Sequence, residues 1–78
     1  MDLASKLKAI RAKEGVTQSE FCELVGFSIS TYKKYESSLF EMGFTALSKV
    51  VNHPRFMKYT LWLMIEQTAP ESGQVSPV

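Results

Sequence analysis

The sequence predicts an all-α domain of five short helices. Apolar residues recur along most of the chain at the three- and four-residue spacing of a helix face, and no segment alternates polar and apolar residues as a half-buried strand does. Capping residues and the two glycines Gly15 and Gly26 divide the first half of the chain into short segments. With 78 residues, 45% of them hydrophobic, the chain has the size and composition of one globular domain.

The first helix is predicted to follow Asp2, whose side chain can cap the first turn. Leu3, Leu7 and Ile10 lie at the spacing of one buried face. Gly15 ends this helix, because glycine readily adopts the left-handed conformation found just beyond helix ends.

The second helix has the clearest start signal in the sequence. Residues 17–20 read Thr-Gln-Ser-Glu, a capping box in which the Thr17 hydroxyl accepts the Glu20 N–H and the Glu20 carboxylate accepts the Thr17 N–H. Gly26 ends the helix, and a third helix capped by Ser28 begins only two residues later. Helices joined by so short a turn must cross at a steep angle, which is typical of a helix-turn-helix.

The third helix, predicted to end near residue 36 or 37, has one aromatic side and one small, polar and basic side. Tyr32 and Tyr35 point toward the core. The opposite arc, which contains no acidic residue, consists of Ile29, Ser30, Lys33, Lys34 and Ser37. A helix-turn-helix presents this face to the major groove of DNA.

Each side chain on this face has a suitable chemistry for DNA. Ser30 can donate to or accept from a base edge, Lys34 can donate to guanine, and Ile29 can contact a thymine methyl group. Lys33 suits a phosphate, as do the outward amides at Gln18, the first residue of the second helix. Two alternatives stay open: the lysines are only a solvated surface, or Ile29 belongs to the core.

Other polar residues have structural interpretations. Thr17 is first of all a helix cap. Arg11 and Glu36 each sit beside the apolar stripe of their helix, which predicts an ion pair that ties the first helix to the end of the third.

A fourth helix is predicted over residues 44–52, and a fifth helix over 54–67 with a proline in its first turn. The fifth helix carries more apolar residues than one stripe, and the excess, above all Leu61, Trp62 and Ile65, predicts a homodimer interface. In the alternative, the tail folds back over this surface. Residues 1–69 thus form the domain, and the polar composition of residues 70–78 predicts a loosely ordered tail.

Composition argues against several other classes. One cysteine, Cys22, and one histidine, His53, offer neither an internal disulfide nor a zinc site, and neither paired carboxylates nor a phosphate-binding glycine loop is present. We therefore expect no enzyme, cofactor or metal. No signal peptide or membrane-spanning stretch is evident, so we expect a cytoplasmic protein.

Residues 3–52 resemble the lambda-repressor-like (Cro/C1-type, XRE) helix-turn-helix family. The resemblance lies in Val16-Thr17-Gln18, Gly26-Phe27-Ser28 and Tyr35-Glu36-Ser37. The segment FMKYTLWLMIEQTAPESGQVSPV resembles the C-terminal part of the immunity repressors C of P2-like temperate bacteriophages.

The resemblance implies a five-helix, lambda-repressor-like DNA-binding domain. It further implies a dimer that represses the early lytic promoter at operator DNA and keeps a prophage dormant in its bacterial host. The residues that it assigns to DNA contact are Thr17, Gln18, Ser28, Ile29, Ser30, Thr31, Lys33 and Lys34. Where relatives carry a basic or glycine-containing loop after the third helix, this chain has Ser-Leu-Phe-Glu at residues 38–41.

The sequence therefore predicts a sequence-specific, homodimeric repressor of a P2-like phage or prophage. A Cro-like or antitoxin-type autoregulator is an alternative within the same class. A protein-interaction adaptor that uses the fifth helix is an alternative from another class. Whether an antirepressor protein binds, and whether the DNA half-sites are inverted or directly repeated, stays open.

Overall fold

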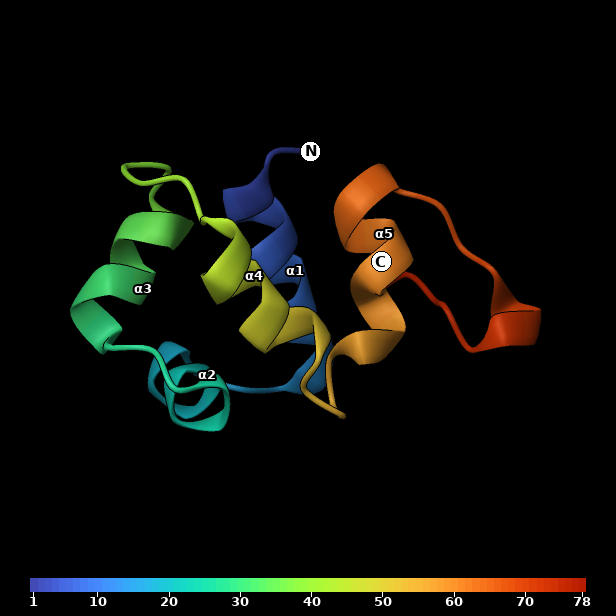
Figure 1. Cartoon of the computed structure of the whole chain (residues 1–78), viewed down its shortest axis with the longest axis horizontal. Helices are drawn as coiled ribbons and strands as arrows, with labels where there is room; N and C mark the ends of the chain where they lie inside the picture. The colour runs from blue at the N-terminus through green and yellow to red at the C-terminus, as the bar shows by residue number, and fades with distance from the viewer.

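The computed structural model describes residues 1–78 and is all-α, which confirms the predicted fold class (Figure 1). Its α-helices are α1 (Leu3–Glu14), α2 (Gln18–Val25), α3 (Ile29–Glu36), α4 (Phe44–Val51) and α5 (Thr60–Ile65). Two 3-10 helices, η1 (Met57–Tyr59) and η2 (Pro70–Ser72), flank α5. In Figure 1, α2 and α3 occupy one end of the molecule and the C-terminal loop the other, with α1 and α4 between them.

The first three helices begin and end where local signals predict. The Asp2 carboxylate accepts the Ser5 N–H at 2.9 Å, and both hydrogen bonds of the Thr17–Glu20 capping box form, at 3.1 and 2.9 Å. Gly26 ends α2 in the left-handed region, with φ at 79°. A side chain there would strain the backbone, so glycine is what permits the tight turn into α3.

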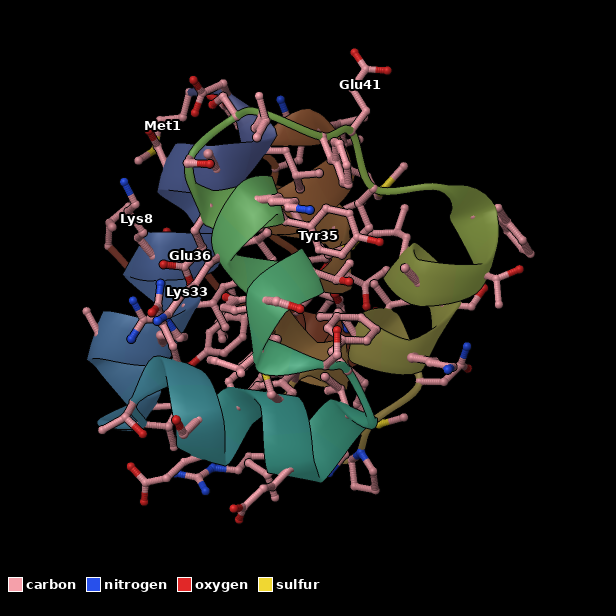
Figure 2. All side chains as sticks on the ribbon, turned by 90° about the vertical axis from the view of Figure 1, so that its left-hand side faces the viewer. Met1, Lys8, Lys33, Tyr35, Glu36 and Glu41 are labelled. Atoms are coloured by element: carbon pink, nitrogen blue, oxygen red, sulfur yellow. The ribbon has the colours of Figure 1, made fainter.

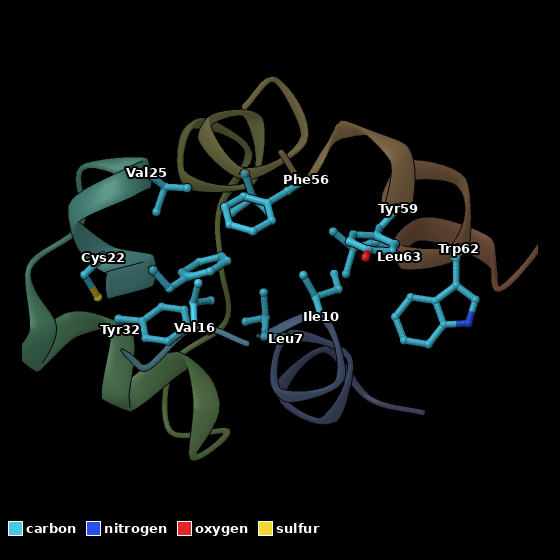
Figure 3. Packing of buried hydrophobic residues seen from close by; sticks show 12 residues of the cluster. Leu7, Ile10, Val16, Cys22, Val25, Tyr32, Phe56, Tyr59, Trp62 and Leu63 are labelled. Carbon is cyan, nitrogen blue, oxygen red and sulfur yellow. The ribbon is translucent and has the colours of Figure 1, made fainter. Parts of the chain in front are cut away.

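The core joins the helix-turn-helix to the segment that precedes α5 (Figure 3). The Phe21 ring lies 4.9 Å from that of Tyr32 and 4.8 Å from that of Phe56, measured between ring centroids. All three are fully or almost fully buried, together with Leu7 and Ile10 of α1. Tyr32 thus anchors α3 from its inner side, so the opposite side of this helix must face outward.

The fifth helix is shorter than the predicted 54–67. Residues 52–56 form a turn, in which the N–H groups of Phe56 and Met57 both donate to the His53 carbonyl at 2.9 Å. This turn lets Phe56 enter the core, and a 3-10 turn follows before α5 begins at Thr60. Glu66 then adopts a left-handed conformation, with φ at 55°, and ends the helix.

The C-terminal segment folds back on α5, unlike the loosely ordered tail expected from its composition. Ala69 and Gln74 pair as an antiparallel bridge, and the Val75 N–H donates to the Lys58 carbonyl at 2.9 Å. The Gln74 side chain accepts the Leu61 N–H at 2.9 Å and donates to the Met57 carbonyl at 3.0 Å. One glutamine therefore satisfies backbone groups at the start of α5, a role that polar composition does not reveal.

Two polar clusters tie the α5 region to α1. The Glu14 carboxylate accepts hydrogen bonds from Tyr59 at 2.6 Å and Arg55 at 2.9 Å, and pairs with Lys58 at 3.0 Å. At the other end, the buried Lys6 ammonium donates to the Leu63 carbonyl at 3.0 Å. None of the helices is both long and apolar enough to cross a membrane.

Candidate nucleic-acid interface

The outer face of α3 is open to solvent and lies toward the viewer in Figure 2. Ser30, Lys33 and Lys34 are exposed, and Ile29 is 38% exposed, which places it outside the core. The inward positions of the same helix are filled by Tyr32 and Glu36, both buried. The structure thus brings Ile29, Ser30 and Lys34, the predicted base-reading residues, together with Lys33 on one acid-free surface.

The start of α3 combines helix capping with exposure. The Ser28 hydroxyl accepts the Thr31 N–H at 3.3 Å and donates to the Thr31 hydroxyl at 2.9 Å. Ser28 is exposed and Thr31 half-buried. Since each hydroxyl can take part in further hydrogen bonds, capping leaves both able to contact a phosphate or base.

A side-chain hydrogen bond links the start of α2 to the end of α3. The Thr17 hydroxyl is used by the capping box, and the Gln18 side-chain amide donates to Glu36 at 3.2 Å. Gln18 is therefore held against α3 by its side chain. The N–H groups of Gln18 and Ser19, in the first turn of α2, have no acceptor within the helix and can bind an anion.

Arg11 and Glu36 form a bidentate ion pair that fixes α3 against α1. Arg11 Nε donates to one carboxylate oxygen of Glu36, Nη2 donates to the other at 2.8 Å, and Nη1 donates to the Val16 carbonyl at 3.1 Å. Burial acts to raise the pKa of Glu36, but the hydrogen bonds, foremost those from Arg11, outweigh it and hold the pKa below its usual value. Glu36 is therefore ionised and paired near neutral pH.

Comparison with known proteins agrees with this geometry. A helix-turn-helix family model matches residues 7–52, more than half of the chain and the segment from α1 to the end of α4. The chain belongs to the helix-turn-helix family. It is also similar to Repressor protein C of Escherichia phage P2, with 32% identity over 75 residues that cover 96% of this chain and 76% of that protein. Members of this family are DNA-binding regulators, and the predicted lambda-repressor-like fold is confirmed.

Within this helix-turn-helix protein, the segment that follows α3 holds features that the sequence did not reveal. Leu39, Phe40 and Phe44 are exposed around the end of α3 and the start of α4. The Phe40 ring lies against the ammonium of Lys34, 4.8 Å from ring centroid to Nζ. Figure 2 also shows Lys8 of α1 toward the same edge of this face as Lys33. A lone exposed lysine or phenylalanine gives no sequence signal, because only the fold brings it beside α3.

The three residues expected at a dimer interface have different positions in the structure. Trp62 is only 5% exposed and belongs to the core, so its assignment to a free surface needs correction. Its ring faces α1, where Lys6 Nζ lies 5.9 Å from the ring centroid. Leu61 is half-buried and Ile65 is 60% exposed. These two line an apolar groove between α5 and the tail, together with Val51, Met57, Met64 and Ala69.

Cys22 and His53 have structural surroundings. Cys22 is buried in the core, and this burial raises the pKa of its thiol. The His53 ring accepts the Arg55 N–H through Nδ1 at 3.1 Å, which stabilises the turn before η1. No three acidic, histidine or cysteine side chains come together in a way that could hold a metal ion.

Proposed function

We propose that this helix-turn-helix protein is a homodimeric transcriptional repressor of a P2-like phage or prophage. It binds operator DNA at the early lytic promoter and thereby maintains lysogeny. One observation carries the proposal: α3 presents an exposed face without acids in a chain that resembles Repressor protein C of phage P2 over nearly its whole length. The protein acts in the cytoplasm of the bacterial host, on chromosomal or prophage DNA.

In this proposal α3 enters the major groove. Ser30 and Lys34 read base edges by hydrogen bonding, and Ile29 contacts a thymine methyl group. Lys33 and the residues at the helix starts, Thr17, Gln18, Ser28 and Thr31, hold the phosphate backbone and set the register of the protein on the duplex. The Arg11–Glu36 pair contributes indirectly, because it fixes the orientation of α3.

The apolar groove beside α5 supports the homodimer. Met64 and Ile65 are more than half exposed, although α5 is one of the most apolar segments of the chain. A second copy that covers Leu61, Met64 and Ile65 would remove this surface from water and add stability to a domain too small to bury much of its own. It would also place two reading helices on one molecule, which suits an operator with two half-sites.

DNA binding across a salt series tests the proposal. The duplex from the early-promoter region is compared with unrelated duplex DNA by fluorescence anisotropy, and sedimentation gives the oligomeric state. We expect the promoter DNA to bind about a thousandfold more tightly, with affinity falling steeply as salt rises. Equal and weak binding to both duplexes, from a monomer, would overturn the proposal and favour a protein-interaction adaptor.

A further inference from the structure

We propose that Phe40, in the loop after α3, is a positioning residue that orients Lys34 for DNA recognition. The inference rests on the proposed function, because it concerns how one residue of the reading face finds its target. It assigns a role in specificity to a loop that carries no basic residue.

The contact between the two side chains is specific. The Lys34 ammonium lies over the Phe40 ring, 4.8 Å from its centroid, within the range at which the electron-rich face of an aromatic ring attracts a cation. Lys34 takes part in none of the five ion pairs of the structure, so no carboxylate competes for its charge. Phe40 is 49% exposed, so the contact lies at the surface.

The backbone brings the ring to this lysine. Ser38 adopts a left-handed conformation, with φ at 64°, and reverses the chain at the end of α3. The N–H groups of Leu39 and Phe40 then both donate to the Lys34 carbonyl, at 3.0 and 3.2 Å, and the Ser37 hydroxyl donates to the same oxygen at 3.2 Å. The loop is thus fastened to the residue whose side chain the ring covers.

The Phe40 ring lies at a recess between the loop and α1. Phe40 lines a recess together with Leu3 of α1 and Tyr35 of α3. A lysine whose ammonium lies against an aromatic ring samples fewer rotamers than a lysine free in solvent. Because the ring occupies one side of the ammonium, N–H groups on the other side remain free to donate to guanine.

The test compares the DNA affinity of Phe40→Leu protein with that of the wild type. The first duplex is the stretch of the early-promoter region that the wild-type protein protects, and the others each carry one base-pair change in that stretch. Loss of an exposed cation–π contact corresponds to a two- to fivefold weaker specific complex. We expect this weaker binding to be accompanied by reduced discrimination between bases at one base pair only. Phe40→Tyr keeps an aromatic face and should retain both affinity and discrimination.

A double-mutant cycle separates positioning from general stability. In Lys34→Ala protein, Phe40→Leu should have no further effect on DNA affinity, while in Lys33→Ala protein it should weaken binding as in the wild type. The matched control is Leu39→Ala, which shortens a side chain in the same loop that is more exposed than Phe40. This variant should bind DNA as the wild type does. Thermal melting curves show which variants fold.

The outcomes are distinguishable. Additive effects of Lys34→Ala and Phe40→Leu, or unchanged discrimination in folded Phe40→Leu protein, would overturn the positioning role and leave the repressor proposal intact. Tighter binding by Phe40→Leu would also overturn it, since the ring would then withhold the lysine from DNA. A wild-type protein without preference for the promoter would instead overturn the proposed function itself.

Discussion

Replacement of Arg11 by methionine should unfold much of this protein, although the position lies in α1, outside the proposed DNA-contacting helix α3. The change keeps most of the apolar length of the side chain but removes all three hydrogen bonds that the guanidinium donates. Glu36, only 3% exposed, then keeps the hydrogen bond from the Gln18 amide but has no cation paired with it.

The expected cost is about 3–5 kcal/mol, because breaking a buried ion pair leaves an uncompensated charge. A domain of 78 residues has a total stability of roughly 4–12 kcal/mol. The single change therefore removes a large part of the free energy of unfolding, and we expect the melting temperature to fall by at least about 12 °C.

Urea and thermal denaturation followed by circular dichroism measure this loss. Glu36→Gln is the matched control, since it removes the charge while keeping a polar side chain of the same shape, and it should cost less than Arg11→Met. The double variant Arg11→Met/Glu36→Leu should recover much of the stability, because the buried charge is gone. A loss below about 1 kcal/mol in Arg11→Met would refute the reasoning.

Three further predictions concern other parts of the molecule. Burial alone would raise the pKa of Glu14, but hydrogen bonds from Tyr59 and its basic neighbours hold this pKa at about 2. Between about pH 4.5 and pH 2 the unfolded chain therefore binds more protons than the folded one, and the free energy of unfolding should fall by on the order of 2 kcal/mol over this range. Glu14→Gln should flatten this part of a urea-denaturation pH series. Lys34→Ala should weaken specific DNA binding by about 1–3 kcal/mol and relax one base preference, whereas Lys33→Ala should weaken binding to all sequences alike in the same anisotropy assay. Ile65→Asp should give a folded monomer by sedimentation.

Each of these has an outcome that would contradict it. A Glu14→Gln protein with the wild-type loss of stability in acid would mean that other carboxylates cause the pH dependence. A uniform effect of Lys34→Ala across all base-pair variants would remove that lysine from the reading set. An Ile65→Asp protein that still dimerises would place the interface elsewhere.

The parts of the fold that the sequence predicted are those set by neighbours in the chain. The caps at Asp2 and Thr17 and the glycine at position 26 act within one helical turn, so the first three helices could be placed from local pattern alone. The acid-free face of α3 followed from helical periodicity once its ends were known.

The parts that sequence analysis misplaced depend on contacts between distant residues. The fifth helix is shortened because Phe56 enters the core and packs on Phe21 of α2, and the tail is ordered because Gln74 bonds the backbone of α5. Trp62 was assigned to a free surface because a surplus of apolar residues on one helix does not reveal which of them are buried within the same chain. The contact of Phe40 with Lys34 depends on the left-handed turn at Ser38, which no residue type announces.

The two clusters that fasten the α5 region to α1 determine how the proposed dimer would measure distance along DNA. Glu14 holds the start of this region and Lys6 holds its end. Because Arg11 of the same helix α1 holds α3 through Glu36, we expect α5 and α3 to move as one body. Such a dimer would hold its two copies of α3 at a fixed distance from each other. An operator whose half-sites are moved apart by half a helical turn of DNA should lose binding. An operator whose half-sites are moved apart by a full turn would present the correct groove to each α3, but at the wrong separation.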